Sequence, residues 1–92
     1  MKILLLEDEL MLNSAISEYL KNIGHMVESC FDGAEVLKSI ENGYDLLILD
    51  VNVPNVDGFS ILNELNNRKI HIPTIFISAQ IDIEDITKAY NL

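Results

Sequence analysis

The chain has 92 residues and a mass of 10.4 kDa, which is the size of one small domain spanning residues 1–92. Its 6 Lys and Arg against 15 Asp and Glu give a formal net charge of -9, which opposes binding to nucleic acid or to an anionic membrane surface. Hydrophobic residues make up 49% of the chain and charged residues 23%, a composition that excludes intrinsic disorder and predicts a folded domain.

A single cysteine, Cys30, excludes an internal disulfide framework and any metal site built from several cysteines. This is typical of a reducing compartment, and we expect a cytoplasmic protein. The apolar run of residues 3–6 ends at Glu7, Asp8 and Glu9 and is too short for a signal peptide. No stretch approaches the ~18 apolar residues of a membrane span, so we expect no membrane association.

The first half of the chain alternates short apolar runs with segments of helical periodicity. Residues 3–6 are predicted to form a buried strand. A helix follows, ended by Gly24 in a left-handed conformation, and its apolar face is formed by Leu12, Ile16, Leu20 and Ile23. Residues 26–30 are less apolar and are predicted to form an edge strand. Asp32 is predicted to cap a second helix that ends at residues 42–43, with an inner face of Val36, Leu37 and Ile40.

The second half repeats this alternation. Residues 46–49 are predicted to form another fully apolar strand. Asp57 and Gly58 open a helix whose inward side chains are Phe59, Leu62 and Leu65. Pro73 precedes a strand at residues 74–78, and Asp82 caps a last helix with Ile83, Ile86 and Tyr90 on one side. The order is βαβαβαβα, and apolar and polar residues do not alternate within the strands. Together these features predict an α/β fold with a parallel sheet covered on both faces.

Ligands of such sheets bind at the carboxyl ends of the strands. The residues that follow the first, third and fourth strands are mostly acidic or polar: Glu7, Asp8, Glu9, Asp50, Asn52, Ser78 and Gln80. Carboxylates that are brought together raise one another's pKa unless a hard cation holds them through oxygen ligands. We therefore expect a Mg²⁺ site at this end of the sheet.

Helix capping is the alternative role for part of this set. Glu7, Asp8 and Glu9 precede a helix, where acids also cap free N–H groups, and the sequence leaves the two roles equally open. Asp57 is interpreted as a cap. Asp50 is separated from the next helix by residues 51–56 and is too far away to cap it, which favours a functional role.

The two histidines do not extend this site. His25 and His71 fall in connections at the opposite, amino-terminal end of the predicted sheet, so neither can join Asp50 in a hydrolase arrangement. The sequence also has no Gly-x-Ser-x-Gly elbow and no Gly-rich phosphate loop, which argues against Ser-dependent hydrolysis and nucleotide binding.

These residues resemble the receiver domain of two-component response regulators. The resemblance is carried by Glu7 and Asp8, by residues 50–58 (DVNVPNVDG) and by residues 73–79 (PTIFISA), and it runs over all 92 residues. Flavodoxin-like sheets of this kind have the strand order 2-1-3-4-5. The resemblance thus implies a doubly wound parallel sheet in the order 2-1-3-4, with the fifth strand and fifth helix missing.

The resemblance also implies a role for each matching residue. Asp50 would accept a phosphoryl group from the phosphohistidine of a histidine kinase. Asp8 would bind Mg²⁺ directly and Glu7 through water, with Asp50 and the backbone carbonyl of Asn52 as further ligands. Ser78 would hydrogen-bond the phosphoryl oxygens and move its loop, which makes the domain a switch for partner interactions.

The carboxyl-terminal part of the family pattern has no counterpart. The family's phosphoryl-binding lysine is missing, and Lys88 lies within the predicted last helix and does not replace it. We expect an exposed edge on the fourth strand and hence a homodimer, formed by edge pairing or by exchange of terminal elements. We also expect a longer parent protein with an effector domain, which can be a DNA-binding regulator of transcription.

Two other functions stay open. One is an interaction module that works without phosphorylation, because the missing lysine can prevent the reaction or its readout. The other is a Mg²⁺-dependent phosphohydrolase with Asp50 as the nucleophile. The phosphohydrolase is disfavoured because the pattern of such enzymes has a second Asp two positions after the nucleophile, where this chain has Asn52. It is also disfavoured because the chain has no cap domain.

Overall fold

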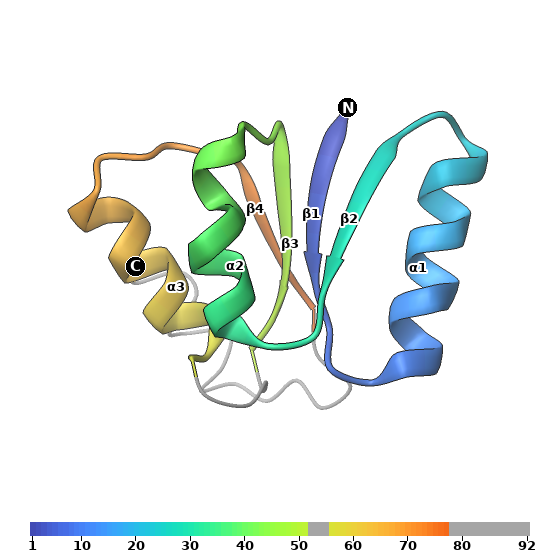
Figure 1. The fold of residues 1–92 in the computed structure, drawn as a ribbon, viewed down its shortest axis with the longest axis horizontal. Helices are drawn as coiled ribbons and strands as arrows, with labels where there is room; N and C mark the ends of the chain where they lie inside the picture. The colour runs from blue at the N-terminus through green and yellow to red at the C-terminus, as the bar shows by residue number, and fades with distance from the viewer. Residues whose placement is uncertain (52–55, 78–92) are drawn as a thin grey trace.

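The computed structural model describes residues 1–51 and 56–77. Within these residues, four strands and three α-helices alternate along the chain: β1 (Lys2–Leu6), α1 (Leu10–Asn22), β2 (Met26–Cys30), α2 (Gly33–Ser39), β3 (Leu46–Asp50), α3 (Gly58–Asn67) and β4 (Thr74–Ile77), with a short 3₁₀ helix η1 (Ile40–Asn42) after α2. The strands form one parallel sheet in the order β2-β1-β3-β4 (Figure 1). The predicted α/β class and strand order are confirmed, whereas the predicted helix after Asp82 lies outside the described residues.

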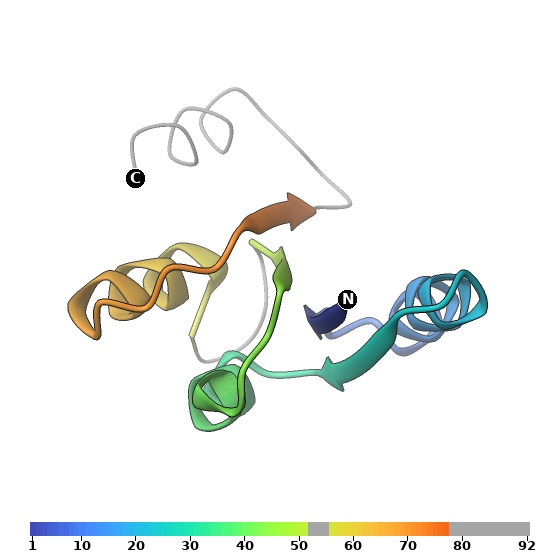
Figure 2. The ribbon, with the colours of Figure 1, turned by 90° about the horizontal axis from the view of Figure 1, so that it is seen from above.

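The helices cover both faces of the sheet, as Figure 2 shows, with α1 on one side and α2 and α3 on the other. Successive side chains of a strand point to opposite faces. Leu4 and Leu6 of β1 therefore pack under α2 and α3, while Ile3 and Leu5 pack in a second cluster with residues of α1. Both faces of the central strands are apolar, which explains why their sequences show no alternation.

Acidic side chains cap the N-termini of all three described α-helices. Glu9 accepts hydrogen bonds from the backbone N–H groups of residues 11 and 12, at 3.2 and 2.9 Å. Asp32 and Asp57 cap α2 and α3 in the same way, which confirms both predictions. Gly24 follows α1 with a φ of 100°, the left-handed conformation that glycine adopts without strain. The capping role left open among the three N-terminal acids therefore belongs to Glu9.

The predicted buried face of α1 is partly wrong. The buried residues of this helix are Asn13 and Ser17, whereas Leu12 and Ile23 are 37% and 55% exposed. The remaining predicted positions, Ile16 and Leu20, pack against the second core cluster as expected. The helix is turned relative to the prediction because the amide of Asn13 hydrogen-bonds two strand-end carbonyls, which periodicity in the sequence does not reveal.

The predicted face of α3 is partly confirmed and needs one correction. Leu65 is buried and Leu62 packs against the core as predicted, but Phe59 is only partly buried and the fully buried residue is Ile61, which was not predicted. The reason lies at Gly58, where a Cβ atom would stand 3.1 Å from the carbonyl oxygen of Asp50 and 3.1 Å from a ring atom of Phe76. Because no side chain stands between them, the start of α3 lies close to the sheet, and Ile61 one turn further on packs in the core.

No helix in the described part of the chain combines the length and the apolar character needed to cross a bilayer.

Candidate metal centre

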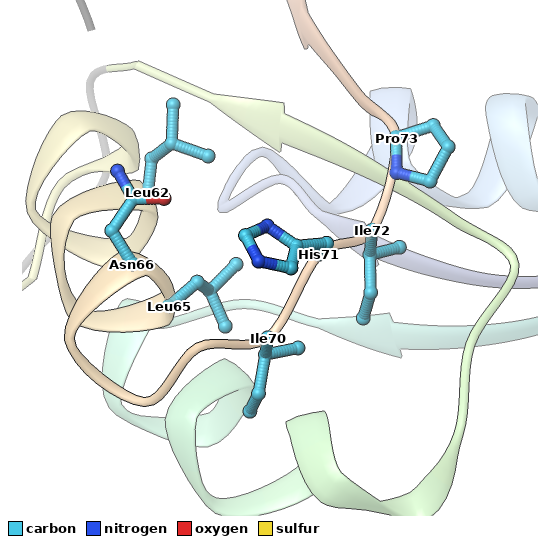
Figure 3. A pocket seen from close by; sticks show the side chains of 7 residues that line it. All are labelled: Leu62, Leu65, Asn66, Ile70, His71, Ile72 and Pro73. Atoms are coloured by element: carbon cyan, nitrogen blue, oxygen red, sulfur yellow. The ribbon is translucent and has the colours of Figure 1, made fainter.

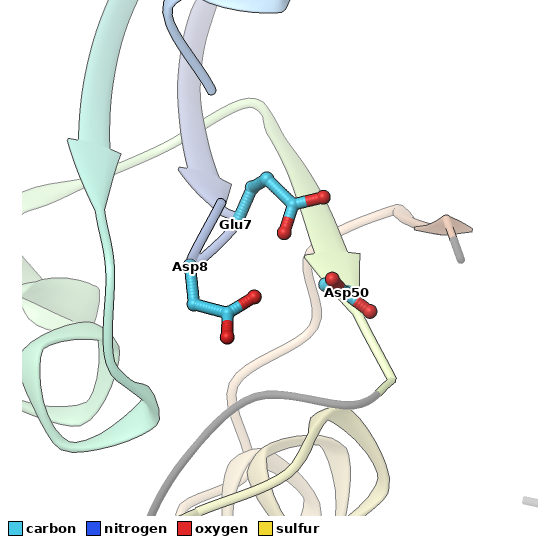
Figure 4. Close-up of side chains that lie close together, drawn as sticks. All are labelled: Glu7, Asp8 and Asp50. Carbon is cyan, nitrogen blue, oxygen red and sulfur yellow. The ribbon is translucent and has the colours of Figure 1, made fainter. Parts of the chain in front are cut away.

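Three carboxylates meet at the carboxyl end of the sheet. Glu7 and Asp8 directly follow β1, and Asp50 is the last residue of β3. The two strands are neighbours, paired in a register that sets Leu6 beside Leu49, so the residues after them emerge side by side. One carboxylate oxygen from each of Glu7, Asp8 and Asp50 lies within 4.8 Å of the others, and Figure 4 shows the three side chains grouped around a common space.

The cluster is buried on one side and open on the other. Glu7 is 2% exposed and Asp50 is 6% exposed, whereas Asp8 is exposed at the rim. Burial raises the pKa of Glu7 from 4.5 to about 7, and a hydrogen bond shared with the Asp50 side chain and the negative charge of Asp50 act in the same direction. The backbone N–H of Glu9, 3.3 Å from a carboxylate oxygen of Glu7, opposes this increase without cancelling it. Near neutral pH Glu7 is therefore still partly protonated, whereas an isolated glutamate would be ionised.

The donor set fits a hard divalent cation. Carboxylate oxygens are the ligands that Mg²⁺ prefers, and Mg²⁺ is commonly bound through one or two carboxylates with several water molecules. Burial is the largest cause of the raised pKa of Glu7 and the negative charge of Asp50 adds to it, so an ionised Glu7 is disfavoured here unless a positive charge lies nearby. A cation would relieve the same repulsion that the proton relieves, so cation and proton should compete for this site.

Backbone contacts hold both strand ends in place. The N–H of Glu7 donates to the carbonyl of Cys30 at 3.1 Å, and the N–H of Val51 donates to the carbonyl of Ile77 at 3.3 Å. The side chain of Asn13 donates to the carbonyl of Glu7 at 2.9 Å. Asn13 is not identifiable as a site residue from the sequence, because a polar residue in the first turn of a helix carries no signal that distinguishes a buried amide from a solvated one.

The structure brings together three of the predicted site residues, Glu7, Asp8 and Asp50. Asn52 and Ser78, predicted as a metal ligand and a phosphoryl-binding residue, lie outside the described residues, as does Gln80. Those two site roles therefore stay predictions. The three residues that do converge come from the ends of two neighbouring strands, as expected from parallel pairing.

The histidines lie elsewhere, as the sequence indicated. His25 precedes β2 at the amino-terminal end of the sheet, where its Nδ1 is 2.9 Å from the amino group of Met1. His71 lines a cavity of about 410 Å³ together with Leu65 of α3 and Ile70 of the following connection (Figure 3). His71 lies before the start of β4 and His25 before the start of β2, whereas the acidic cluster lies where β1 and β3 end. Neither histidine therefore belongs to the cluster.

Comparison with known protein families gives a match over almost the whole chain. The family model described as the response regulator receiver domain matches residues 3–92. Among curated proteins, the transcriptional regulatory protein CiaR of Streptococcus pneumoniae is 35% identical over 92 residues, covering 99% of this chain and 41% of that protein. RprY of Bacteroides fragilis, also a transcriptional regulatory protein, is 36% identical over 93 residues, covering 100% of this chain and 39% of that protein. The chain thus spans about two fifths of the length of these relatives.

Similar solved structures are also response regulators or their receiver domains. The receiver domain of the Francisella response regulator 1452 superposes with a TM-score of 0.88 at 31% identity, covering 97% of this chain and 75% of that one. The response regulator TrrA of Thermotoga maritima, solved in complex with Mg²⁺-BeF, superposes with a TM-score of 0.85 at 27% identity, covering 97% of this chain and 78% of that one.

Proposed function

The chain belongs to the response regulator receiver domain family, and on that premise we propose that Asp50 is the phospho-acceptor of a two-component switch. Receiver domains are regulatory domains, and the relatives above are transcriptional regulatory proteins. The observation that carries the proposal is the position of Asp50, which ends a buried strand and shares a cluster with Glu7 and Asp8.

The proposed reaction is a phosphoryl transfer from a phosphohistidine of a histidine kinase. A carboxylate oxygen of Asp50 forms a bond to phosphorus while the P–N bond breaks, and the electron pair of that bond stays on the imidazole nitrogen. The product is an aspartyl phosphate on this chain. Asp50 has to be ionised to act as the nucleophile.

Glu7, Asp8 and Asp50 would hold Mg²⁺, with Glu7 acting through water and the backbone carbonyl of Asn52 as a further ligand. Support comes from the three carboxylate oxygens within 4.8 Å of one another and from the raised pKa of Glu7. When bound, Mg²⁺ supplies positive charge that offsets the repulsion between the anionic acceptor and the phosphoryl oxygens. The protein contributes a rigid strand end that orients Asp50 for attack.

Ser78 is proposed to receive the phosphoryl oxygens and to pass the change to partner surfaces. The hydrogen bond from the N–H of Val51 to the carbonyl of Ile77 supports this, because it links the residue after Asp50 to the residue before Ser78. A histidine kinase is the proposed phosphodonor. Since the chain spans 41% of the length of CiaR, a DNA-binding effector in a longer protein is the proposed output.

Self-association is a second proposal, carried by the edge of the sheet. Among the described residues, no strand pairs with the outer side of β4, and Ile75 on this strand is 50% exposed. An apolar edge strand with free backbone groups is a template for pairing with another chain. A second copy of this chain, related by a two-fold axis, is the proposed occupant. This surface also suits the alternative of an interaction module that works without phosphorylation.

Labelling by a small phosphodonor tests the assignment of Asp50. The chain is incubated with acetyl phosphate and Mg²⁺, and the covalent adduct is detected by intact mass. Asp50→Asn should abolish the adduct, because the amide is not a nucleophile for phosphorus. Asp57→Asn is the matched control, since it removes a carboxylate that caps α3 and lies outside the acidic cluster, and it should label like the wild-type chain. Undiminished labelling of Asp50→Asn would refute the acceptor assignment.

A further inference from the structure

Asn13 is a polar side chain buried between a helix and the sheet. It lies in the first part of α1 and is 1% exposed, while its apolar neighbour Leu12 is 37% exposed. Burial of an amide costs free energy unless its polar groups find hydrogen-bond partners. An apolar residue at position 13 would fill the same space without this cost, so the amide should have a role beyond packing.

The amide of Asn13 ties the ends of two strands together. Its Nδ2 atom donates to the carbonyl of Glu7 at 2.9 Å and to the carbonyl of Cys30 at 3.2 Å. The carbonyl of Cys30 also accepts the backbone N–H of Glu7, at 3.1 Å. Both the N–H and the C=O of Glu7 are therefore held, one on each side of its Cα atom. The anchor points are the ends of β1 and β2 and the first turns of α1.

This arrangement has a direct consequence for Asp8. The peptide bond is planar, so the direction of the Glu7 carbonyl fixes the positions of the nitrogen and Cα atoms of Asp8. Asp8 is exposed, and burial does not hold its carboxylate in place. On the other side, Glu9 is fixed as the N-cap of α1. The backbone of Asp8 is thus held on one side by the hydrogen bond of Asn13 to Glu7 and on the other by the start of α1.

We propose that Asn13 is a positioning residue for the acidic cluster, which orients the Glu7–Asp8 peptide so that both carboxylates converge on Asp50. The inference rests on the proposed function, because it takes cation binding as the task of the cluster. Hydrogen-bond partners that orient metal ligands typically change metal affinity by about 10- to 100-fold when they are removed. Asn13 makes no contact with the cation in this proposal and acts only through the backbone of Glu7.

The test compares two buried polar residues on the same face of α1. Asn13→Leu keeps the approximate size of the side chain and removes both donated hydrogen bonds. Ser17→Ala, one turn further along, removes a buried hydroxyl and leaves both hydrogen bonds donated by Asn13 in place. Mg²⁺ is titrated into each protein and followed by amide NMR, and urea unfolding gives the stability of each. We expect the Mg²⁺ dissociation constant to rise by about 10- to 100-fold in Asn13→Leu and to stay unchanged in Ser17→Ala.

A purely structural role predicts a different pattern, in which both variants lose stability and both keep their Mg²⁺ affinity. A folded Asn13→Leu variant that binds Mg²⁺ like the wild-type chain would therefore overturn the proposal. If Asn13→Leu does not fold, Asn13→Ala takes its place with the same expectations, because alanine has the highest helix propensity.

A second readout separates this inference from the proposed function. In the cation-free protein, the nitrogen shift of an amide responds to the hydrogen bond accepted by the preceding carbonyl. The amide signals of Asp8 and Phe31, which follow Glu7 and Cys30, should move in Asn13→Leu and stay in place in Ser17→Ala. A wild-type chain that does not bind Mg²⁺ would refute the proposed function. The shifts would then still decide the role of Asn13, since unmoved signals contradict it and moved signals support it.

Discussion

The raised pKa of Glu7 predicts that the acidic cluster destabilises the cation-free fold at neutral and alkaline pH. Because the pKa of Glu7 is 4.5 in the unfolded chain and about 7 in the folded protein, the folded state binds this proton more tightly. The free energy of unfolding should therefore fall as the pH rises from 4.5 to 7 and then stay level. At 1.36 kcal/mol per pKa unit, the loss is about 3 kcal/mol, a large part of the stability of a small domain.

Glu7→Gln isolates this effect. Glutamine has the shape of the protonated acid, and its side-chain oxygen can still accept the N–H of Glu9. The variant should match the wild-type chain near pH 4.5 and exceed its unfolding free energy by about 3 kcal/mol at pH 8 without divalent cations. Added Mg²⁺ should narrow the difference at pH 8, because it binds the folded wild-type chain and stabilises it.

Urea unfolding followed by far-UV circular dichroism is the suitable assay, since the chain has no tryptophan. Both proteins are measured with EDTA between pH 4.5 and 8. The control is Glu41→Gln, an exposed acid in η1 whose loss changes the net charge equally, so it separates the effect of burying Glu7 from that of net charge. A difference between Glu7→Gln and wild type that stays constant with pH would refute the reasoning.

Two further predictions concern the core and the sheet edge. Ile61→Ala should lower the unfolding free energy by about 2–5 kcal/mol and Leu62→Ala by markedly less, because Ile61 is fully buried and Leu62 is not. Equal losses of unfolding free energy in urea would contradict the corrected face of α3. The wild-type chain should have the mass of a dimer in light scattering at high concentration, and Ile75→Lys should restore the monomer mass, because a lysine on an edge strand opposes pairing. A dimer that survives Ile75→Lys would exclude pairing through β4.

Much of the architecture follows from residues that are close together in the chain. The apolar runs at residues 3–6 and 46–49 mark buried parallel strands, because both of their faces are covered. Asp32 and Asp57 cap helices through contacts two and three residues away. Patterns of this kind are local and can be predicted without knowing the fold. The strand order, in contrast, came from the resemblance to receiver domains.

The candidate site, too, could be predicted in part from the sequence. The sequence indicated that the acids after β1 and Asp50 after β3 belong together, because parallel strands end at the same edge of a sheet. It left open which of the three N-terminal acids would cap the helix. The tertiary structure assigns this role to Glu9 and leaves Glu7 and Asp8 to face Asp50.

The sequence by itself determined the alternation of strands and helices, the caps of α2 and α3 and the set of acids from which the site is built. Only the tertiary structure decided the burial of Asn13 in place of Leu12, the position of Ile61 in the core and the raised pKa of Glu7. Each of these depends on contacts between segments far apart in the chain, such as Asn13 with Cys30 and Glu7 with Asp50. The rotation of a helix on a sheet and the desolvation of a carboxylate are set by such contacts, and periodicity along one segment does not contain them.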